Sequence, residues 1–371
     1  MMFPPFTFLY LADASVSVFF VLSGYVLTRR FYETGNVREF EPAAIKRYVR
    51  LGLPVFASVM LAWILLVTGA YGNHLAGPLG TAAWPLALYT EPVSFVGAIF
   101  RGLIGAPLFG RVDLNGPLWS LQVEIVGSIL LFACYSLFAV RSKLLLIFWF
   151  VFFAFFIGGR APAMLNYVAL LAGSLLHVIK DRLRLSPVLA ITCLILGLVG
   201  VSFTFAPFFA PLQMLPLPDL TPYGHRAAHE ILLVDGNLGP TFQADRRLIW
   251  HTLGAILLVA GVVSVPVASR ILSSRLPVYL GKISFAVYLL HFPLNMSLSY
   301  RVAQLGQSLG ASYLVSAILA FVALMVALLT SAELFYRFVD APSARLAEWL
   351  ARSVSRSPAP AAIAPVAVPA E

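Results

Sequence analysis

Long apolar runs alternate with short polar segments along almost the whole chain. A membrane-spanning helix needs about 20 mostly apolar residues, because each residue advances the helix by 1.5 Å through a hydrocarbon layer about 30 Å thick. Runs near this length predict an all-α, polytopic membrane helix bundle of about nine spans. The predicted spans are 13–28, 53–70, 118–138, 144–158, 162–179, 187–206, 248–268, 283–300 and 312–336.

The apolar run at 92–106 differs from these, since Arg101 interrupts it and Pro92 and Pro107 bracket it. Basic residues stay on the cytoplasmic side of a membrane, so their positions decide whether this run crosses. The basic clusters all fall on one side only if 92–106 does not cross. The clusters are Arg29, Arg30, Arg38, Lys46, Arg47 and Arg50; Arg141 and Lys143; Lys180, Arg182 and Arg184; Arg270, Arg275 and Lys282; and Arg337, Arg345, Arg352 and Arg356.

We therefore predict that 92–106 is interfacial or re-entrant, that the N-terminus is outside and that the C-terminus is cytoplasmic. Residues 1–345 form the predicted transmembrane domain. Residues 346–371 are rich in Ala and Pro and are predicted to be a disordered cytoplasmic tail. The expected location is the plasma (inner) membrane, in multi-pass form.

Composition excludes a soluble globule. The chain is 60% hydrophobic and 11% charged, whereas soluble domains carry about 25% charged residues. The formal charge of +9 does not indicate a nucleic-acid partner, because the basic residues lie in short loops between apolar runs. The lipid bilayer is the expected partner. Cys134 and Cys193 both lie inside apolar runs and predict no disulfide.

Segment 18–25 reads Val-Phe-Phe-Val-Leu-Ser-Gly-Tyr, and segment 46–54 is a basic run that ends in Pro. Segment 116–124 has the form Trp-Ser-x-x-x-Glu, and segment 280–291 has the form Gly-x-x-Ser-x-x-x-Tyr-Leu-x-His. In this order the four segments resemble the FFVLSG helix, the basic run before a Pro, the Trp-Ser/Thr-x-x-x-Glu motif and the Gly-x-x-Ser-x-x-x-Tyr-Leu-x-His pattern of the acyltransferase-3 family of membrane acyltransferases. Each motif is weak alone, and the order makes the set specific. The resemblance covers roughly 13–345.

This resemblance implies an enzyme that moves an acyl group, acetyl or similar, from cytoplasmic acyl-CoA to a hydroxyl group. The implied acceptor is a carbohydrate or a lipid-linked glycan, as in O-acetylation and polysaccharide modification. Arg47 and Arg50 lie three residues apart and share a helix face. Paired guanidinium groups suit the phosphates of acyl-CoA. The alternative is that they serve only the positive-inside topology.

Glu124 lies inside a predicted span, where a carboxylate is costly unless it faces a cavity or a partner. It could hold a catalytic group or accept a hydrogen bond from an acceptor hydroxyl; the alternative is a structural bond between helices. Trp119 and Ser120 are expected to line the substrate path, although Trp119 also suits an interfacial anchor. Ser23, with Gly24, is interpreted as permitting close helix packing and is a further candidate lining residue.

Ser284, Tyr288 and His291 fall on one helical face. Such a polar stripe inside a membrane is expected to line the bundle interior, with Tyr288 and His291 in a catalytic role, unless it forms a satisfied core network. His225 and His229, next to Glu230, could hold a metal if helical, with only Asp219 or Asp235 as a third ligand. We interpret this stretch as a polar outer loop instead, and expect no metal.

The family usually has ten spans. Its first helix precedes the FFVLSG helix and carries an Arg and a later His thought to be catalytic. Only Met1 to Ala12 come before that segment here, and no His precedes His74. Two interpretations stay open, an incomplete version of a longer protein or a degenerate relative; nine spans with an outside N-terminus favour the first. Without this base we expect about 10²–10⁴-fold slower transfer.

Two other classes remain as alternatives. A glycan or lipid transporter would need broken helices paired in two halves of the chain. Pro92, Pro107 and Pro117 cluster in one region without such a counterpart, which disfavours a transporter. A catalytically incomplete homologue that acts as a membrane partner is the second alternative.

Overall fold

The computed structural model describes residues 12–76, 88–139, 142–158, 161–183, 186–204 and 241–355. These residues form helices joined by short turns, with no strand among them, which confirms the predicted all-α class. The larger helices are α1 (Ala12–Thr34), α2 (Phe40–Val67), α5 (Trp119–Phe138), α6 (Lys143–Gly158), α7 (Ala161–Leu183), α8 (Pro187–Val201), α11 (Thr241–Ser264), α13 (Arg275–Leu294), α15 (Tyr313–Phe335) and α16 (Ala341–Ser355).

The protein is an integral membrane helix bundle. Among the described residues, 4 helices are long and apolar enough to cross a bilayer: Val37–Val67, Gly116–Phe138, Arg247–Ser264 and Tyr313–Ser353. Shorter apolar helices accompany them at Phe95–Phe109, Lys143–Phe156, Met164–Val178 and Pro187–Val201. Phe148, Phe155 and Phe156 of α6 are exposed at the protein surface. Such a surface suits hydrocarbon and would be costly in water.

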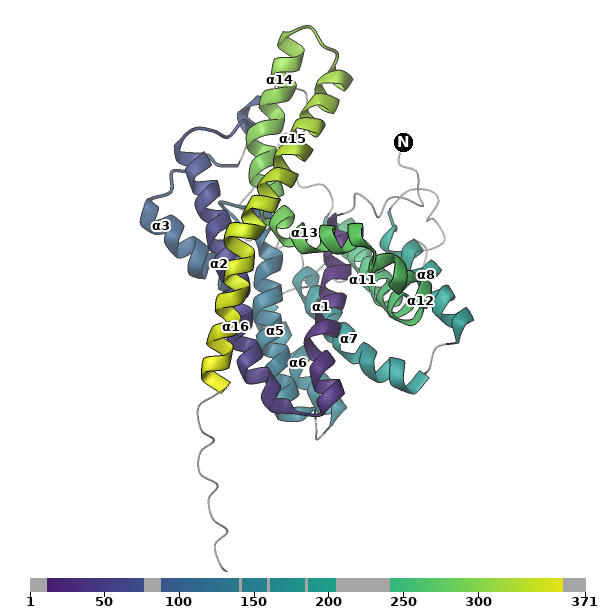
Figure 1. Ribbon diagram of the computed structural model, residues 1–371. Coiled ribbons are helices and arrows are strands. Elements are labelled where there is room, and N and C mark those ends of the chain that lie inside the picture. The colour runs from purple at the N-terminus through teal and green to yellow at the C-terminus, as the bar shows by residue number, and fades with distance from the viewer. Residues whose placement is uncertain are drawn as a thin grey trace, which may run out of the picture.

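The segment around 92–106 lies mostly in one short apolar helix, Phe95–Phe109, that contains a π-helical turn. It consists of α3 (Phe95–Phe100), the π-turn η5 (Arg101–Gly105) and α4 (Ala106–Phe109), and it lies beside α2 (Figure 1). Along α2, Trp63 donates to the carbonyl of Val93 (2.8 Å), and Tyr48, four turns nearer the start of α2, donates to that of Leu103 (2.5 Å).

The chain after Gly110 brings Asn115 back to Ser58 in the second half of α2, with 3.5 Å between the amide nitrogen and the hydroxyl oxygen. An ion pair between Arg101 and Asp113 joins the parts of the chain before and after Gly110. Gly110, in the left-handed region at φ 65°, makes the turn between them. The segment therefore runs along α2 and, after the turn at Gly110, brings Asn115 back to the same helix.

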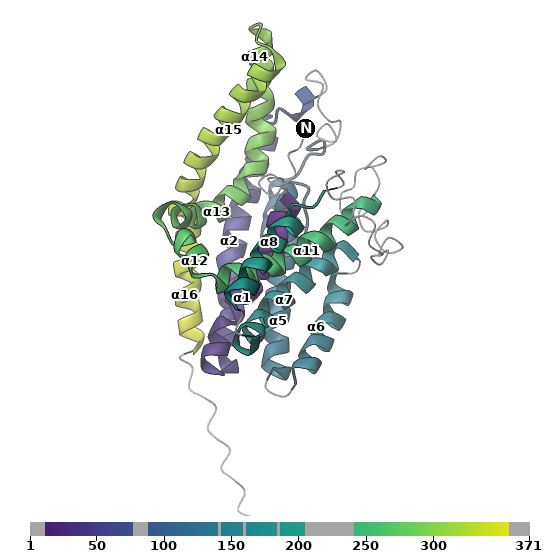
Figure 2. The same ribbon diagram turned by 90° about the vertical axis from the view of Figure 1, so that its right-hand side faces the viewer.

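The predicted span at 283–300 is not one straight helix, and this corrects the sequence analysis. α13 ends at Leu294, a π-turn follows at η8 (Asn295–Ser299), and α14 (Tyr300–Ser308) then runs in a new direction. Figures 1 and 2 both show α13 lying across the bundle while α14 and α15 extend away from it as a hairpin. Pro293 explains the bend, because it lacks an amide hydrogen and clashes with the preceding turn.

α16 begins at Ala341 and continues to Ser355, past the predicted domain boundary at 345. Residues 346–355 are therefore helical rather than disordered, and the rest of the predicted tail lies outside the described residues. α16 packs along α2. Its pairs Glu348–Arg352 and Glu348–Lys46 supply the local and the tertiary support for this helix.

Two glycines let α1 and α7 approach within backbone contact. A side-chain Cβ at Gly24 would overlap the carbonyl of Leu170, and one at Gly173 would overlap the carbonyl of Val21. Membrane helices pack closely where small residues such as glycine lie at their interface, and both positions follow this rule. The expectation that Gly24 serves helix packing is confirmed.

Candidate active site

Three side chains from different helices meet in the interior. Ser23 lies midway along α1, Arg47 two turns into α2 and Glu124 in the second turn of α5. Arg47 Nη2 donates to Ser23 Oγ (3.0 Å) and forms an ion pair with Glu124 Oε1. Ser23 Oγ also donates to Glu124 Oε1. We call Ser23, Arg47 and Glu124 the buried triad.

The buried triad is shielded and only partly satisfied. The side chain of Glu124 is 0% exposed and that of Arg47 is 14% exposed. Two of its buried polar atoms, Arg47 Nε and Glu124 Oε2, have no hydrogen-bond partner within the described structure. A buried unpaired donor or acceptor costs about 1–3 kcal/mol, and more when charged. One donor atom and one acceptor atom of the triad thus have unused hydrogen-bonding capacity within the described structure.

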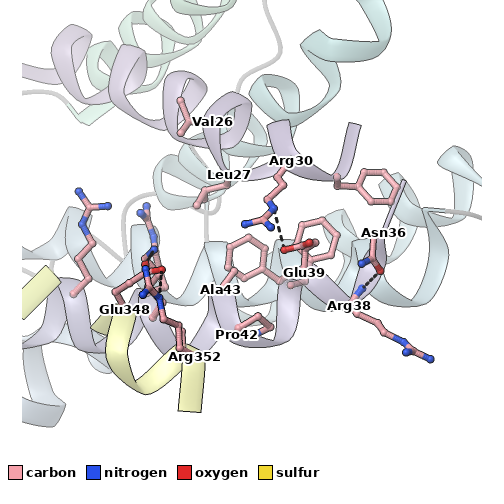
Figure 3. A pocket seen from close by; sticks show the side chains of 17 residues that line it. Val26, Leu27, Arg30, Asn36, Arg38, Glu39, Pro42, Ala43, Glu348 and Arg352 are labelled. Atoms are coloured by element: carbon pink, nitrogen blue, oxygen red, sulfur yellow. Dashed lines mark hydrogen bonds and ion pairs between the residues drawn. The ribbon is translucent and has the colours of Figure 1, made fainter. Parts of the chain in front are cut away.

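A cavity of about 660 Å³ adjoins the triad at the end of the bundle where α1 ends and α2 begins. Arg47 belongs to both the cavity and the buried triad, since it lines this cavity and contacts Ser23. In Figure 3, Val26, Leu27 and Arg30 of α1 face Pro42 and Ala43 of α2, with Glu348 and Arg352 of α16 at one side. We call this cavity the basic pocket.

Positive charge dominates the basic pocket. Its charged lining residues are Arg30, Arg38, Lys46, Arg47, Arg50 and Arg352, against Glu39 and Glu348. The acids are already engaged: Glu39 pairs with Arg30 (3.1 Å), and Glu348 with Lys46 and with Arg352 (3.4 Å) (Figure 3). Arg38 and Arg50 form no carboxylate ion pair within the described residues. An anion that enters the pocket would therefore meet a net excess of positive charge.

Ser120 and Tyr288 continue the polar line from Glu124. Ser120 is four residues before Glu124 on α5, so the two share a helix face. Tyr288 donates to the carbonyl of Pro117 (2.6 Å), and its hydroxyl lies 2.5 Å from that of Ser120. Trp119 is half-buried and packs against the main core. The structure thus joins two predicted motifs, the start of α5 and the middle of α13.

His291 lies one turn beyond Tyr288 and is half-buried. Its Nδ1 is 2.7 Å from the carbonyl oxygen of Tyr288. A carbonyl accepts a hydrogen bond, so Nδ1 carries the proton in the neutral ring and Nε2 holds the lone pair. Ser284 departs from the expectation, because it is exposed and donates to the carbonyl of Gly281 (2.8 Å). The predicted stripe is interior only at Tyr288 and His291.

Arg47 and Arg50 both line the basic pocket, but their side chains have different surroundings. Arg50 is exposed and lines the basic pocket, while Arg47 turns inward to Glu124. Sequence reasoning missed that ion pair, and it missed Lys46, Glu348 and Arg352 as pocket residues. An acid inside one span and a base at the start of another were the available signal, since intramembrane charges pair with each other.

His225 and His229 lie outside the described residues. Within the part of the chain that the structure describes, no group of three His, Cys, Asp or Glu side chains is arranged to hold a metal ion.

Replacing Tyr288 by Phe tests the contact between α5 and α13. The change removes the hydroxyl that reaches Ser120 and Pro117 but keeps the ring, so we expect a loss of about 1–2 kcal/mol in the free energy of unfolding. Thermal unfolding of the purified protein measures it. Tyr313→Phe is the matched control, because Tyr313 is exposed. Equal stability of both variants would show that the hydroxyl of Tyr288 contributes nothing.

Comparison with known proteins identifies the family to which the chain that forms this arrangement belongs. A family model described as an acyltransferase domain matches residues 1–337. The chain belongs to the acyltransferase-3 family. The match includes the buried triad and the segments of α5 and α13 that carry Ser120, Tyr288 and His291.

Three relatives show how far the similarity extends. O-acetyltransferase PaAT-1 of Phomopsis amygdali is 24% identical over 389 residues, covering 92% of this chain and 75% of that protein. Acyltransferase R4 of Phoma sp. is 34% identical over 108 residues, or 28% of this chain and 23% of that protein. Acyltransferase clz18 of Cochliobolus lunatus is 35% identical over 111 residues, or 29% and 24% respectively. No solved structure matches the chain.

The match thus spans about a quarter of the length of the latter two relatives.

Proposed function

We propose that this acyltransferase-3 protein moves an acetyl or similar acyl group from acyl-CoA to a hydroxyl of a carbohydrate or lipid-linked glycan. The observation that carries the proposal is that the basic pocket ends at Arg47, which is also part of the buried triad. In this proposal Arg47 lies between the site that holds the phosphates of the donor and the site of proton transfer.

Arg50, Lys46, Arg352 and Arg38 would hold the phosphates of the donor, because guanidinium and ammonium groups pair with phosphate oxygens. The elongated acyl-bearing arm of the donor would then point toward Arg47. In this orientation the basic pocket faces the cytoplasm, the N-terminus is outside and the C-terminus is inside, as the positive-inside rule predicts. The plasma (inner) membrane is the proposed location.

Glu124 would receive the proton of the acceptor hydroxyl. Its Oε2 is buried and lacks a partner within the described residues, so it has the capacity to accept one further hydrogen bond. Ser120, Tyr288, His291 and Trp119 would line the acceptor's approach. The name of PaAT-1, an O-acetyltransferase, supports an acetyl donor and an oxygen acceptor.

Replacing Arg50 by Gln tests the donor site. We expect the Kd for acetyl-CoA to rise about 10–100-fold, because a charged hydrogen bond contributes about 1.5–3 kcal/mol. Isothermal titration of the detergent-solubilised protein measures it. Arg29→Gln is the matched control, since Arg29 is on α1 near the pocket but pairs outside it with Glu33 (2.7 Å). An unchanged Kd in Arg50→Gln, or equal effects in both variants, would contradict the assignment.

A further inference from the structure

We propose that Ser23 is a catalytic nucleophile that carries the acyl group as a covalent ester between donor and acceptor. This inference rests on the proposed function. It assigns to Ser23 a role beyond lining the substrate path, and it makes the transfer a two-step reaction through the enzyme.

The contacts of Ser23 determine where its proton points. Arginine nitrogens only donate hydrogen bonds, so Arg47 Nη2 must donate to Ser23 Oγ. The single hydroxyl hydrogen of Ser23 is then directed at the carboxylate of Glu124. A serine hydroxyl that donates to a buried carboxylate and is oriented by a third group has the arrangement of an activated nucleophile.

Ser23 also lies next to the basic pocket. It shares one face of α1 with Leu27 and Arg30, four and seven residues later, and both of these line the pocket. Ser23 is one turn deeper in the bundle than Leu27, about 6 Å along the helix. A thioester whose phosphates are held among the pocket arginines would therefore present its carbonyl carbon near Arg47 and Ser23.

In the first step, Ser23 Oγ forms a bond to the thioester carbonyl carbon and passes its proton to Glu124. The carbon–sulfur bond breaks, and the CoA thiolate leaves with the proton from Glu124 as the free thiol. During the attack the carbonyl oxygen gains negative charge. Arg47 Nε, a buried donor without a partner within the described residues, is available to stabilise it.

In the second step, the acceptor hydroxyl gives its proton to Glu124 and attacks the acyl-Ser23 carbonyl. The bond to Ser23 Oγ breaks, and Ser23 regains the proton from Glu124. The acceptor ester forms without any further reactant. The donor approaches from the basic pocket, whereas Ser120 and Tyr288 lie on the other side of Glu124 and would line the approach of the acceptor. The two substrates therefore react with Ser23 in turn.

Isotope exchange tests the intermediate without an acceptor. The full-length purified protein is incubated with unlabelled acetyl-CoA and radiolabelled free CoA, and label in acetyl-CoA is followed. A covalent acyl-enzyme returns its acyl group to labelled CoA, whereas direct transfer gives no exchange. We expect exchange in the native protein and a loss of about 100-fold or more in Ser23→Ala. Ser17→Ala is the matched control, since Ser17 is buried on the same helix and, among the described residues, its hydroxyl donates only to the carbonyl of Asp13.

A second variant separates chemistry from folding. Ser23→Cys would form a thioester that neutral hydroxylamine removes, and mass spectrometry of the peptide that contains residue 23 would detect it. Acetyl-CoA binding without exchange and without acylated residue 23 in the native protein would overturn the inference and leave the proposed donor site intact. Failure to bind acetyl-CoA would instead overturn the proposed function and, with it, the role of Ser23.

Discussion

Replacing Glu124 by Gln is expected to lower the rate of acyl transfer by about 10²–10⁴-fold, the usual contribution of a positioned proton-transfer group. Glutamine keeps the shape of the side chain and can still accept a hydrogen bond from Ser23, but it cannot take up the hydroxyl proton. Turnover of acetyl-CoA to free CoA by the purified protein, with an accepted glycan, measures the loss. Glu33→Gln is the control, because Glu33 is exposed and pairs with Arg29 outside the basic pocket.

The same substitution also leaves Arg47 charged and buried without its carboxylate partner. Breaking a buried pair on one side costs about 3–5 kcal/mol in the free energy of unfolding, so instability and lost chemistry must be separated. The double variant Arg47→Met with Glu124→Leu removes both charges and is expected to recover most of that stability. If it is stable and retains native activity, the triad has no catalytic role.

Replacing Gly173 by Val is expected to abolish most of the folded protein. The new side chain would overlap the backbone carbonyl of Val21, and neither helix can move without separating α1 from α7. Overpacking commonly costs about 1–3 kcal/mol, and a backbone collision between two spans belongs at or above the upper end. Fluorescence-detected size-exclusion chromatography measures the monodisperse fraction.

Gly281→Ala is the matched control for this substitution. Gly281 lies within α13, and a Cβ there meets nothing within 4 Å. Alanine favours a helix interior over glycine by about 1 kcal/mol, so this variant is expected to be at least as stable as the native protein. A native-like profile for Gly173→Val would show that α1 and α7 are farther apart than the structure places them.

Hydropathy and charge predicted those parts of the fold that depend on neighbours in sequence. Apolar length located the helices, because this signal is local along the chain. Arg101 within the run at 92–106 and the prolines that bracket it also distinguished this shorter helix from the longer ones. The helix over 346–355 was not predicted from the sequence, because the Ala- and Pro-rich composition beyond residue 355 indicates disorder for the tail as a whole. Glu348 and Arg352, four residues apart, were the helical signal within it.

The candidate site depends on contacts that sequence spacing does not encode. Ser23 and Glu124 are 101 positions apart, and Lys46 and Glu348 are 302 positions apart. From the sequence alone, Arg47 could determine the membrane topology, bind the donor or form an ion pair. Its ion pair with Glu124 becomes visible only when α2 is packed against α5. The bend after Pro293 was likewise hidden, because a proline inside a membrane helix is compatible with either a straight or a broken span.

The position of α16 has a consequence for biosynthesis. One wall of the basic pocket consists of Glu348, Ala351 and Arg352, whereas the opposite wall comes from the first two helices. The ribosome must therefore have synthesised the chain through Arg352 before that cavity is complete. A nascent chain that lacks α16 therefore has an incomplete cavity, and a ligand of this pocket can stabilise the assembled helices only after α16 has packed along α2.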